Sequence, residues 1–202
     1  MKSWFDVQLV ALLVAVAPLS TSSYHPQRAA DVSKPGVGGR QNARDTWTDH
    51  LKLRTYPSAG TIAPGRPVSL VLEIEPADRM HVYAPGNHDY RVITVTLAPQ
   101  RFVRPGPVQY PASEVYLFEP LNERVPVYQK PFKLTLDVTL DRGPEARAAL
   151  KSQPSLTLTG TLDYQACDDR ICFNPVSIPL SWTLALSSGS APAPSGQAPH
   201  EG

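Results

Sequence analysis

The chain of 202 residues has little net charge, few cysteines and little helical periodicity. Its formal charge is +1 at pH 7, and no long run of like charges occurs, so no overall field attracts nucleic acid or anionic lipid. We therefore expect no nucleic-acid partner. After the N-terminal region, no apolar run reaches the length of about 20 residues that a membrane span requires, so the mature form should not span a membrane. Only residues 144–150 predict a helix.

Residues 1–23 have the pattern of an export signal. Lys2 gives a weakly positive start, residues 7–19 are almost entirely apolar, and a cluster of serine and threonine follows. An apolar stretch of this length fits a signal peptide and is too short for a membrane span. Cleavage would fall before Tyr24 or near Ser20, and we expect a periplasmic or secreted protein. The alternative interpretation is a buried N-terminal helix of the fold.

Two further segments contain too few bulky apolar residues to form a core. Residues 24–45 are rich in proline and glycine and predict a flexible leader, whereas residues 187–202 are mostly small or polar and predict a disordered tail. The domain itself should therefore cover residues 46–186.

The chain also contains 22 prolines, about twice the average share. Many of them separate short apolar runs, which favours strands joined by turns over helices.

Between these ends, apolar and polar residues alternate with a period of two. Such alternation places one face of each strand on a core and the other in water. The pattern predicts long strands at residues 68–75, 132–140, 156–165 and 176–186, further strands at 50–56 and 91–97, and shorter ones at 80–83 and 125–128. Short strands in this number, with turn signals between them, indicate an all-β protein built as a two-sheet antiparallel sandwich.

The two cysteines, Cys167 and Cys172, lie on either side of the predicted hairpin tip between the last two long strands. Export would allow them to form a disulfide. A disulfide that closes so short a loop stabilises a fold by only about 2 kcal/mol. A disulfide at an exposed hairpin tip is also accessible to attacking thiolates. At this point a static structural disulfide and a redox-active one both fit the sequence.

A metal site fits the cysteine pair less well. No histidine lies in the hairpin, so His81 or His88 would have to be recruited from elsewhere. We expect both histidines to be ordinary surface or loop residues, and we expect no metal and no cofactor. Next to the cysteines, Arg170 would stabilise a thiolate, whereas Asp168 and Asp169 would disfavour one.

Four sequence motifs resemble the N-terminal periplasmic domain of the thiol:disulfide interchange protein DsbD. They are Tyr-Gln-Ala-Cys and Cys-Phe-Asn-Pro within residues 164–175, Met-His-Val-Tyr-Ala-Pro at 80–85, and Tyr-Pro at 110–111. The resemblance implies an immunoglobulin-like antiparallel β-sandwich with a cysteine-bearing hairpin. It also implies that the cysteines receive electrons from a thioredoxin-like domain and pass them to periplasmic disulfide isomerases or to thioredoxin-like proteins of cytochrome c maturation.

The same resemblance assigns roles to single residues. Cys172 would form the mixed disulfide with partners, and Cys167 would resolve it. A cap loop over the cysteines would lie between Tyr110 and Val125, with Phe118 as its aromatic residue and Tyr116 as the second choice. Tyr83 resembles an active-site tyrosine of the family. An ordinary packing role remains open for each of these aromatic residues.

Two departures from the family limit the resemblance. The best-known member has one more residue between its cysteines, and this chain shows neither the membrane domain nor the thioredoxin-like domain of the full-length protein. We therefore expect a separately encoded electron donor. The leading hypothesis is an exported thiol–disulfide exchange domain that relays electrons among periplasmic thioredoxin-like or disulfide isomerase proteins, as a component of protein-disulfide reduction. The alternative is a non-enzymatic immunoglobulin-like binding module with a structural hairpin disulfide.

Overall fold

The computed structural model describes residues 42–119 and 122–187. The predicted signal peptide at residues 1–23 lies outside the described residues, as do most of the predicted leader and all but the first residue of the predicted tail. Ser187, that first residue, donates its backbone N–H to Ile62 over 3.0 Å. Within the described ranges, the only helix is far too short to cross a bilayer.

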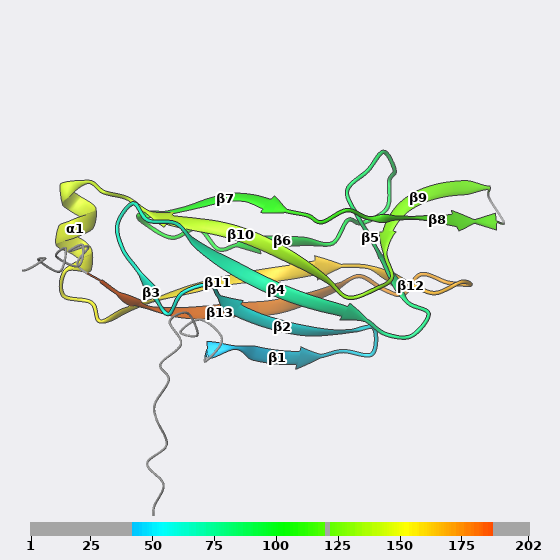
Figure 1. Cartoon of the computed structure of the whole chain (residues 1–202), viewed down its shortest axis with the longest axis horizontal. Coiled ribbons are helices and arrows are strands. Elements are labelled where there is room, and N and C mark those ends of the chain that lie inside the picture. Colours follow the sequence, from blue (N-terminus) through cyan, green and yellow to red (C-terminus); the bar gives the residue numbers. More distant parts are fainter. Residues whose placement is uncertain (1–41, 120–121, 188–202) are drawn as a thin grey trace, which may run out of the picture. The chain divides into compact units, whose positions relative to one another are not determined.

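The described residues form strands almost throughout, together with one short helix (Figure 1). In chain order the elements are β1 (Arg44–Trp47), β2 (Leu51–Pro57), β3 (Thr61–Ile62), β4 (Val68–Pro76), β5 (His81–Tyr83), β6 (Thr94–Leu97), β7 (Val103–Gln109), β8 (Glu114–Phe118), β9 (Glu123–Tyr128), β10 (Phe132–Leu140), α1 (Pro144–Leu150), β11 (Ser155–Tyr164), β12 (Ala166–Cys167) and β13 (Val176–Leu186).

Two sheets form the body of the domain. One has five strands in the order β1-β2-β4-β10-β7, and the other has four in the order β3-β13-β11-β6. All pairs are antiparallel except β13 with β3, which is parallel. Buried side chains from both sheets belong to one continuous hydrophobic cluster, which includes Leu72, Leu134, Leu162 and Trp182. The two sheets therefore pack face to face, and the predicted all-β, immunoglobulin-like sandwich is confirmed.

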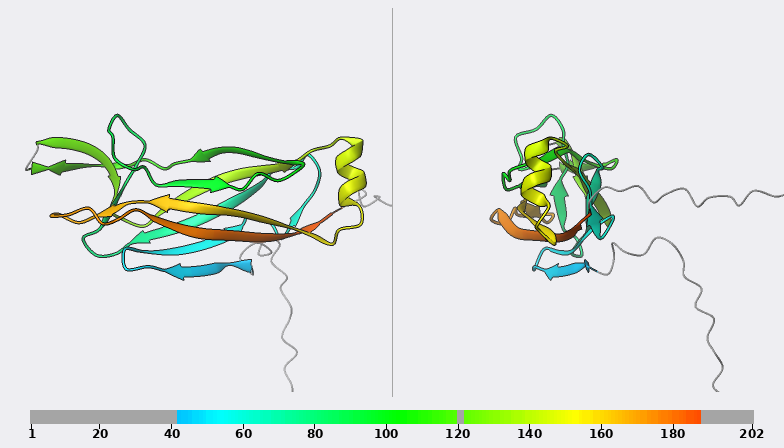
Figure 2. Two further views of the ribbon diagram at one scale, coloured as in Figure 1. Left: turned by 180° about the vertical axis from the view of Figure 1, so that it is seen from behind. Right: turned by 90° about the vertical axis from the view of Figure 1, so that its left-hand side faces the viewer.

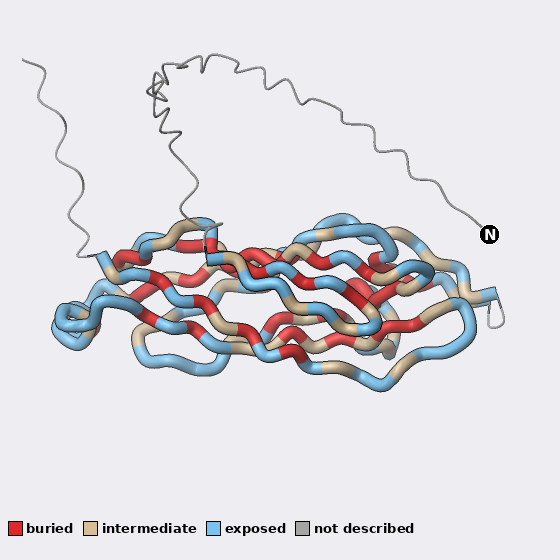
Figure 3. Tube along the Cα trace, turned by 90° about the horizontal axis from the view of Figure 1, so that it is seen from below, coloured by how far each residue is buried: buried red, intermediate tan, exposed pale blue. Residues whose placement is uncertain are grey.

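The alternation read from the sequence corresponds to the observed faces. In β10 every second residue from Leu134 to Leu140 is buried, and the residues between them are only partly covered. Strands β11 and β13 alternate in the same way, and Figure 3 shows buried and exposed positions following one another along much of the trace. The predicted bounds of β10, β13 and α1 agree with the structure residue for residue. Strand β1 begins at Arg44, before the predicted domain boundary at residue 46.

A third, smaller sheet extends the sandwich at one end. Its strand order is β12-β5-β9-β8, and it lies at the end of the domain opposite to α1 (Figures 1 and 2). The cysteine-bearing segment belongs to this sheet through β12. The sandwich thus serves as a rigid base, and the small sheet brings the sequence-predicted site residues together.

Candidate functional site

The cysteines lie just beyond the end of the longest strand pair in the domain. Strands β11 and β13 pair in continuous register from Ser155↔Ala185 to Tyr164↔Val176. After Tyr164 the chain leaves this sheet, and β12 pairs with β5, which places Cys167 opposite His81. Cys167 and Cys172 then form an isolated antiparallel bridge and a disulfide, with their Cα atoms 4.0 Å apart. The predicted hairpin disulfide is therefore present.

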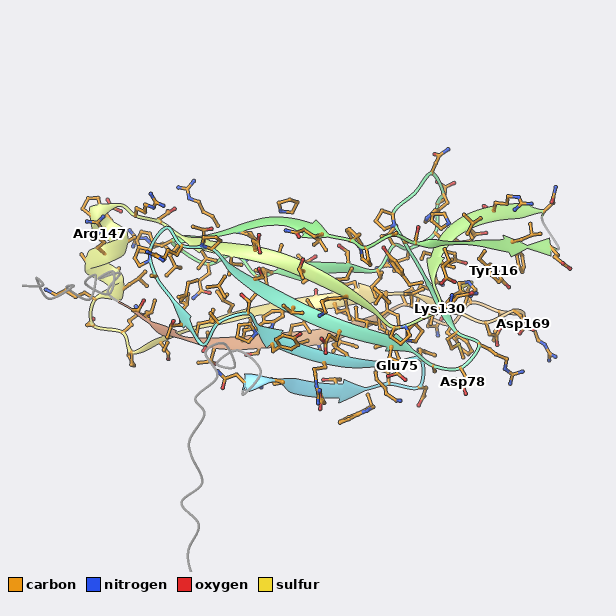
Figure 4. All side chains as sticks on the ribbon, viewed as in Figure 1. Glu75, Asp78, Tyr116, Lys130, Arg147 and Asp169 are labelled. Carbon is orange, nitrogen blue, oxygen red and sulfur yellow. A yellow bond between two sulfur atoms is a disulfide. The ribbon has the colours of Figure 1, made fainter. Side chains whose placement is uncertain are left out.

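The turn between the cysteines is held by the side chain of Asp168. Its Oδ1 accepts the backbone N–H groups of Arg170 and Ile171 over 2.8 and 2.7 Å, and its own N–H donates to the Ile171 carbonyl over 3.0 Å. The hydrogen bonds from Ile171 and Arg170 lower the pKa of Asp168, and the positive charges of Arg170 and Arg79 act in the same direction. Asp169 is exposed at the outer end of this hairpin (Figure 4).

The lowered pKa of Asp168 predicts how the turn responds to acid. A carboxylate with a lowered folded-state pKa stabilises the fold at neutral pH; this contribution declines below the unfolded pKa of about 3.9 and is lost as the pH falls through the lower folded-state pKa. We expect Asp168→Asn to be less stable than the parent protein in urea unfolding at pH 7, and the difference to shrink at pH 3. Asp169→Asn is the control, because that carboxylate accepts none of these bonds. A difference that stays constant with pH would show that the charge of Asp168 does not hold the turn.

The two sulfur-bearing residues differ strongly in exposure. Cys167 is only 2% exposed and packs with Tyr83, Val125 and Val127 in a second hydrophobic cluster. Cys172 is exposed. Both cysteines line a pocket of about 220 Å³. A thiolate from another protein can therefore approach Cys172 more easily than Cys167.

Tyr83 contacts both sulfur atoms. Its hydroxyl lies 3.4 Å from Cys167 Sγ and 3.5 Å from Cys172 Sγ. Because disulfide sulfurs carry no hydrogen, the Tyr83 hydroxyl is the donor. Burial raises the pKa of Tyr83 to about 12, and neighbouring Tyr90 and Glu123 add to the shift. The hydroxyl therefore keeps its proton throughout the physiological pH range and remains available to a sulfur atom.

The segment expected to be a cap loop is a β-hairpin. Strands β8 and β9 pair from Glu114↔Val127 to Phe118↔Glu123, and we call this element (residues 114–128) the cap hairpin. Tyr116 and Phe118, the two candidate cap residues, both line the disulfide pocket. Val115 and Leu117, which alternate with them, are 67% and 36% exposed. Figure 4 shows Tyr116 at the same end of the domain as Asp169.

Seven of the eight predicted site residues thus line one pocket, and Asp169 alone does not. Residues 54–178, more than half of the chain, match the model of the family described as Thiol:disulfide interchange protein DsbD, N-terminal. The chain belongs to this family. A disulfide-bonded cysteine pair in a DsbD N-terminal domain places its general role in thiol–disulfide exchange.

Solved structures similar to this DsbD N-terminal domain include the following two. The N-terminal periplasmic domain of ScsB from Proteus mirabilis is 15% identical, with a TM-score of 0.46, and the match covers 68% of this chain and 47% of that one. The chain therefore spans about half the length of the ScsB structure. The GAE domain of yeast GGA1 is 12% identical, with a TM-score of 0.37 and coverage of 67% and 94%. None of the curated proteins matches the chain.

The structure corrects the expectation for one of the two histidines. His81 is 3% exposed rather than a surface or loop residue, and strand β5 places it in the pocket wall. Its ring packs edge-to-face against Tyr83, with centroids 5.5 Å apart, and lies 4.6 Å from the ring of Tyr116. Burial lowers the pKa of His81, although the charge of Asp168 opposes the shift. His88 is a loop residue, as expected, and its ring nitrogens bond to Ala84 and Tyr90.

Sequence reasoning missed several other residues of this DsbD N-terminal domain. Tyr90 lies in the loop between β5 and β6 and stacks on Tyr83, with ring centroids 4.3 Å apart and an interplanar angle of 6°. Its hydroxyl donates to Glu123 Oε2 over 2.7 Å. Ile171, beside Cys172, is 57% exposed. Of these missed residues it alone carried a signal in the sequence, because it is an apolar residue at the predicted hairpin tip. In residues 42–119 and 122–187 there is no cluster of three or more potential metal ligands.

Proposed function

We propose that the domain relays electrons between proteins through the Cys167–Cys172 disulfide, with Cys172 as the sulfur that partners attack. The observation that carries this proposal is the asymmetry in exposure of the pair, because Cys172 is exposed whereas Cys167 is buried; the Tyr83 hydroxyl lies close to both sulfurs. A purely structural disulfide needs neither an exposed cysteine nor a donor for a leaving thiolate.

In the reductive half of the cycle, a partner thiolate attacks Cys172 Sγ and forms a mixed disulfide. The Cys167–Cys172 bond breaks, and its electron pair stays on Cys167 as a thiolate. The Tyr83 hydroxyl, 3.4 Å from that sulfur, donates a hydrogen bond to the developing charge. The partner's second thiolate then attacks the partner's first sulfur, the one bonded to Cys172, and Cys172 leaves as a thiolate. Two electrons have moved from the partner dithiol to this domain, and the Cys167 and Cys172 thiolates can take up from solvent the two protons that the partner thiols released.

In the oxidative half, the Cys172 thiolate attacks the disulfide of an acceptor protein. Cys167 then attacks Cys172 Sγ in the resulting mixed disulfide, and the acceptor leaves with both of its thiols reduced. The 4.0 Å between the two Cα atoms keeps Cys167 next to the sulfur it must attack. Arg170, which lines the pocket, would favour the thiolate forms.

The partners we propose are periplasmic thioredoxin-like or disulfide isomerase proteins, together with an electron donor. Membership of the DsbD N-terminal family supports partners of this class. We also propose that residues 1–23 direct export, so that the domain of residues 46–186 acts in the periplasm. The cap hairpin, through Tyr116 and Phe118, would shield the disulfide until a partner docks.

The reduction potential of the cysteine pair tests the function directly. The purified protein is equilibrated in graded thiol redox buffers, and alkylated cysteines are counted by mass. We expect a potential within the range of exchange proteins, about −120 to −270 mV. A potential below about −300 mV would mark a structural disulfide. That outcome would favour the alternative function, an immunoglobulin-like binding module whose double serine variant still binds its partner.

A further inference from the structure

One side-chain hydrogen bond ties the outer half of the cap hairpin to the rest of the domain. The Tyr90 hydroxyl donates to Glu123 Oε2 over 2.7 Å, and Glu123 is the first residue of β9. Among the described residues 116–119 and 122–125, no other side chain forms a hydrogen bond or ion pair. Glu123 pairs with Phe118 across the hairpin, so the bond holds the hairpin at the position of a pocket-lining aromatic residue.

We propose that Tyr90 and Glu123 form a latch that keeps the cap hairpin closed over the disulfide and thereby sets the access of thiols to Cys172. This inference rests on the proposed function. Tyr90 is a positioning residue in this scheme, because it touches neither sulfur and acts through Tyr83 and through the hairpin. Its partner Glu123 contributes the charge that strengthens the hydrogen bond.

The Tyr90 side of the latch is well anchored. Its backbone N–H donates to His88 Nδ1 over 3.2 Å, and His88 Nε2 lies 2.8 Å from the Ala84 carbonyl. At Gly86, in the same loop, an added Cβ would lie 2.4 Å from the ring of Pro126, so the loop packs closely against β9. Tyr90 can therefore serve as a fixed attachment point for Glu123 and the cap hairpin.

The hairpin side has a firm base and a less constrained outer end. Near its base, the backbone N–H of Ala84 donates to the Pro126 carbonyl over 3.0 Å, and β5 pairs with β9 at Val82↔Tyr128 and Tyr83↔Val127. At the outer end of the hairpin, in residues 123–125, β9 pairs only with β8 among the described residues, and β8 is an edge strand. The latch is thus placed where a small displacement of the hairpin would uncover the pocket.

The latch also couples the hairpin to the sulfur atoms. Tyr90 stacks on Tyr83 at 4.3 Å, and the Tyr83 hydroxyl contacts both sulfurs. A partner that displaces the cap hairpin would break the Tyr90–Glu123 bond and remove one restraint on the Tyr83 ring. Access to Cys172 and the position of the hydrogen-bond donor would then change together.

Tyr90→Phe tests the latch because it removes the hydroxyl and keeps the stacked ring. We expect it to accelerate reduction of the disulfide by a small phosphine about threefold to tenfold, the range expected for losing one partly exposed, charge-assisted hydrogen bond. Glu123→Ala should give the same acceleration, and the double variant should add nothing further. Glu123→Gln keeps an acceptor and should restore much of the protection.

The chain offers a matched control. The Tyr56 hydroxyl donates to Glu73 Oε1 over 2.8 Å, a tyrosine–glutamate bond in the five-stranded sheet that contacts neither cysteine. Tyr56→Phe should leave the reduction rate unchanged. Equal acceleration in Tyr56→Phe would mean general loosening of the fold, and no acceleration in Tyr90→Phe would overturn the latch.

A second measurement separates the latch from the proposed function. Amide hydrogen exchange of β8 and β9 in the disulfide form should be faster in Tyr90→Phe than in the parent protein, whatever the reduction potential of the cysteines. A potential typical of structural disulfides would refute the electron relay and leave this result standing. Unchanged exchange in β8 and β9 would refute the latch and leave the relay standing.

Discussion

Cys167→Ser is expected to accumulate as mixed disulfides joined through Cys172, whereas Cys172→Ser is expected to form few or none. In the first variant the exposed Cys172 remains as the only thiol of this chain, so a captured partner can no longer be released through Cys167. In the second variant the remaining thiol belongs to Cys167, which is 2% exposed and enclosed by the second hydrophobic cluster. Accessibility of the thiolate governs the rate of exchange, so the two variants should differ by a large factor.

Two assays measure this difference. The first compares alkylation of the single thiol by iodoacetamide in each variant, for which we expect a rate at least about tenfold higher at Cys172. The second exposes each variant to a thioredoxin-like protein in its disulfide form and quantifies covalent complexes on non-reducing gels. The double serine variant is the control for non-covalent association. Equal trapping through both cysteines would refute the assignment of Cys172 as the attacked sulfur.

Tyr83→Phe is expected to slow thiolate attack on the disulfide by about tenfold to a hundredfold. The hydroxyl lies 3.4 Å from Cys167 Sγ, and a hydrogen bond to a charged group contributes about 1.5–3 kcal/mol. Without it the Cys167 thiolate would form in an apolar cluster, so the pKa of the Cys167 thiol should rise in the reduced variant. Because the pKa of Tyr83 is about 12, the hydroxyl stays protonated and the slowing should persist between about pH 5 and 9.

The measurement is the rate of reduction by a dithiol as a function of pH, together with titration of Cys167 in the reduced protein. Tyr110→Phe provides the control, because the Tyr110 hydroxyl donates to the Ile93 carbonyl and to Thr94 outside the disulfide pocket. A Tyr83→Phe protein with the parental rate and an unchanged thiol pKa would show that Tyr83 only fills space. Loss of rate in Tyr110→Phe would indicate a general change of fold instead.

Much of the sandwich could be predicted because its longest strands obey simple alternation. Strands β10 and β13 each bury one face on the common core, and their apolar residues mark that face clearly. Strand β7 was missed because its sequence contains Pro105, Gly106 and Pro107, which normally indicate a turn. It forms an edge strand with a register shift opposite β10, and prolines are tolerated at such an edge.

The cysteines of the site could be predicted, whereas the arrangement around them could not. Spacing and motif identified the disulfide and several of its neighbours, because these residues are close in sequence or belong to a family pattern. The Tyr90–Glu123 bond joins residues 33 positions apart in a loop and a hairpin, and no local periodicity encodes such a pair. Strand β8 was missed for another reason: Val115 and Leu117 are exposed and apolar, so its two faces do not differ in polarity.

The long ladder between β11 and β13 has a consequence for the speed of the proposed electron relay. The ladder continues in register to Tyr164↔Val176, next to the cysteine hairpin, so the two thiols remain neighbours after the disulfide is reduced. Closing the bond again requires no search through chain conformations, and opening it releases little conformational entropy. The oxidised and reduced forms can therefore share one scaffold with little reorganisation between them. Turnover of such a carrier would be set by its encounters with partners and by the release of products, and not by refolding of the domain.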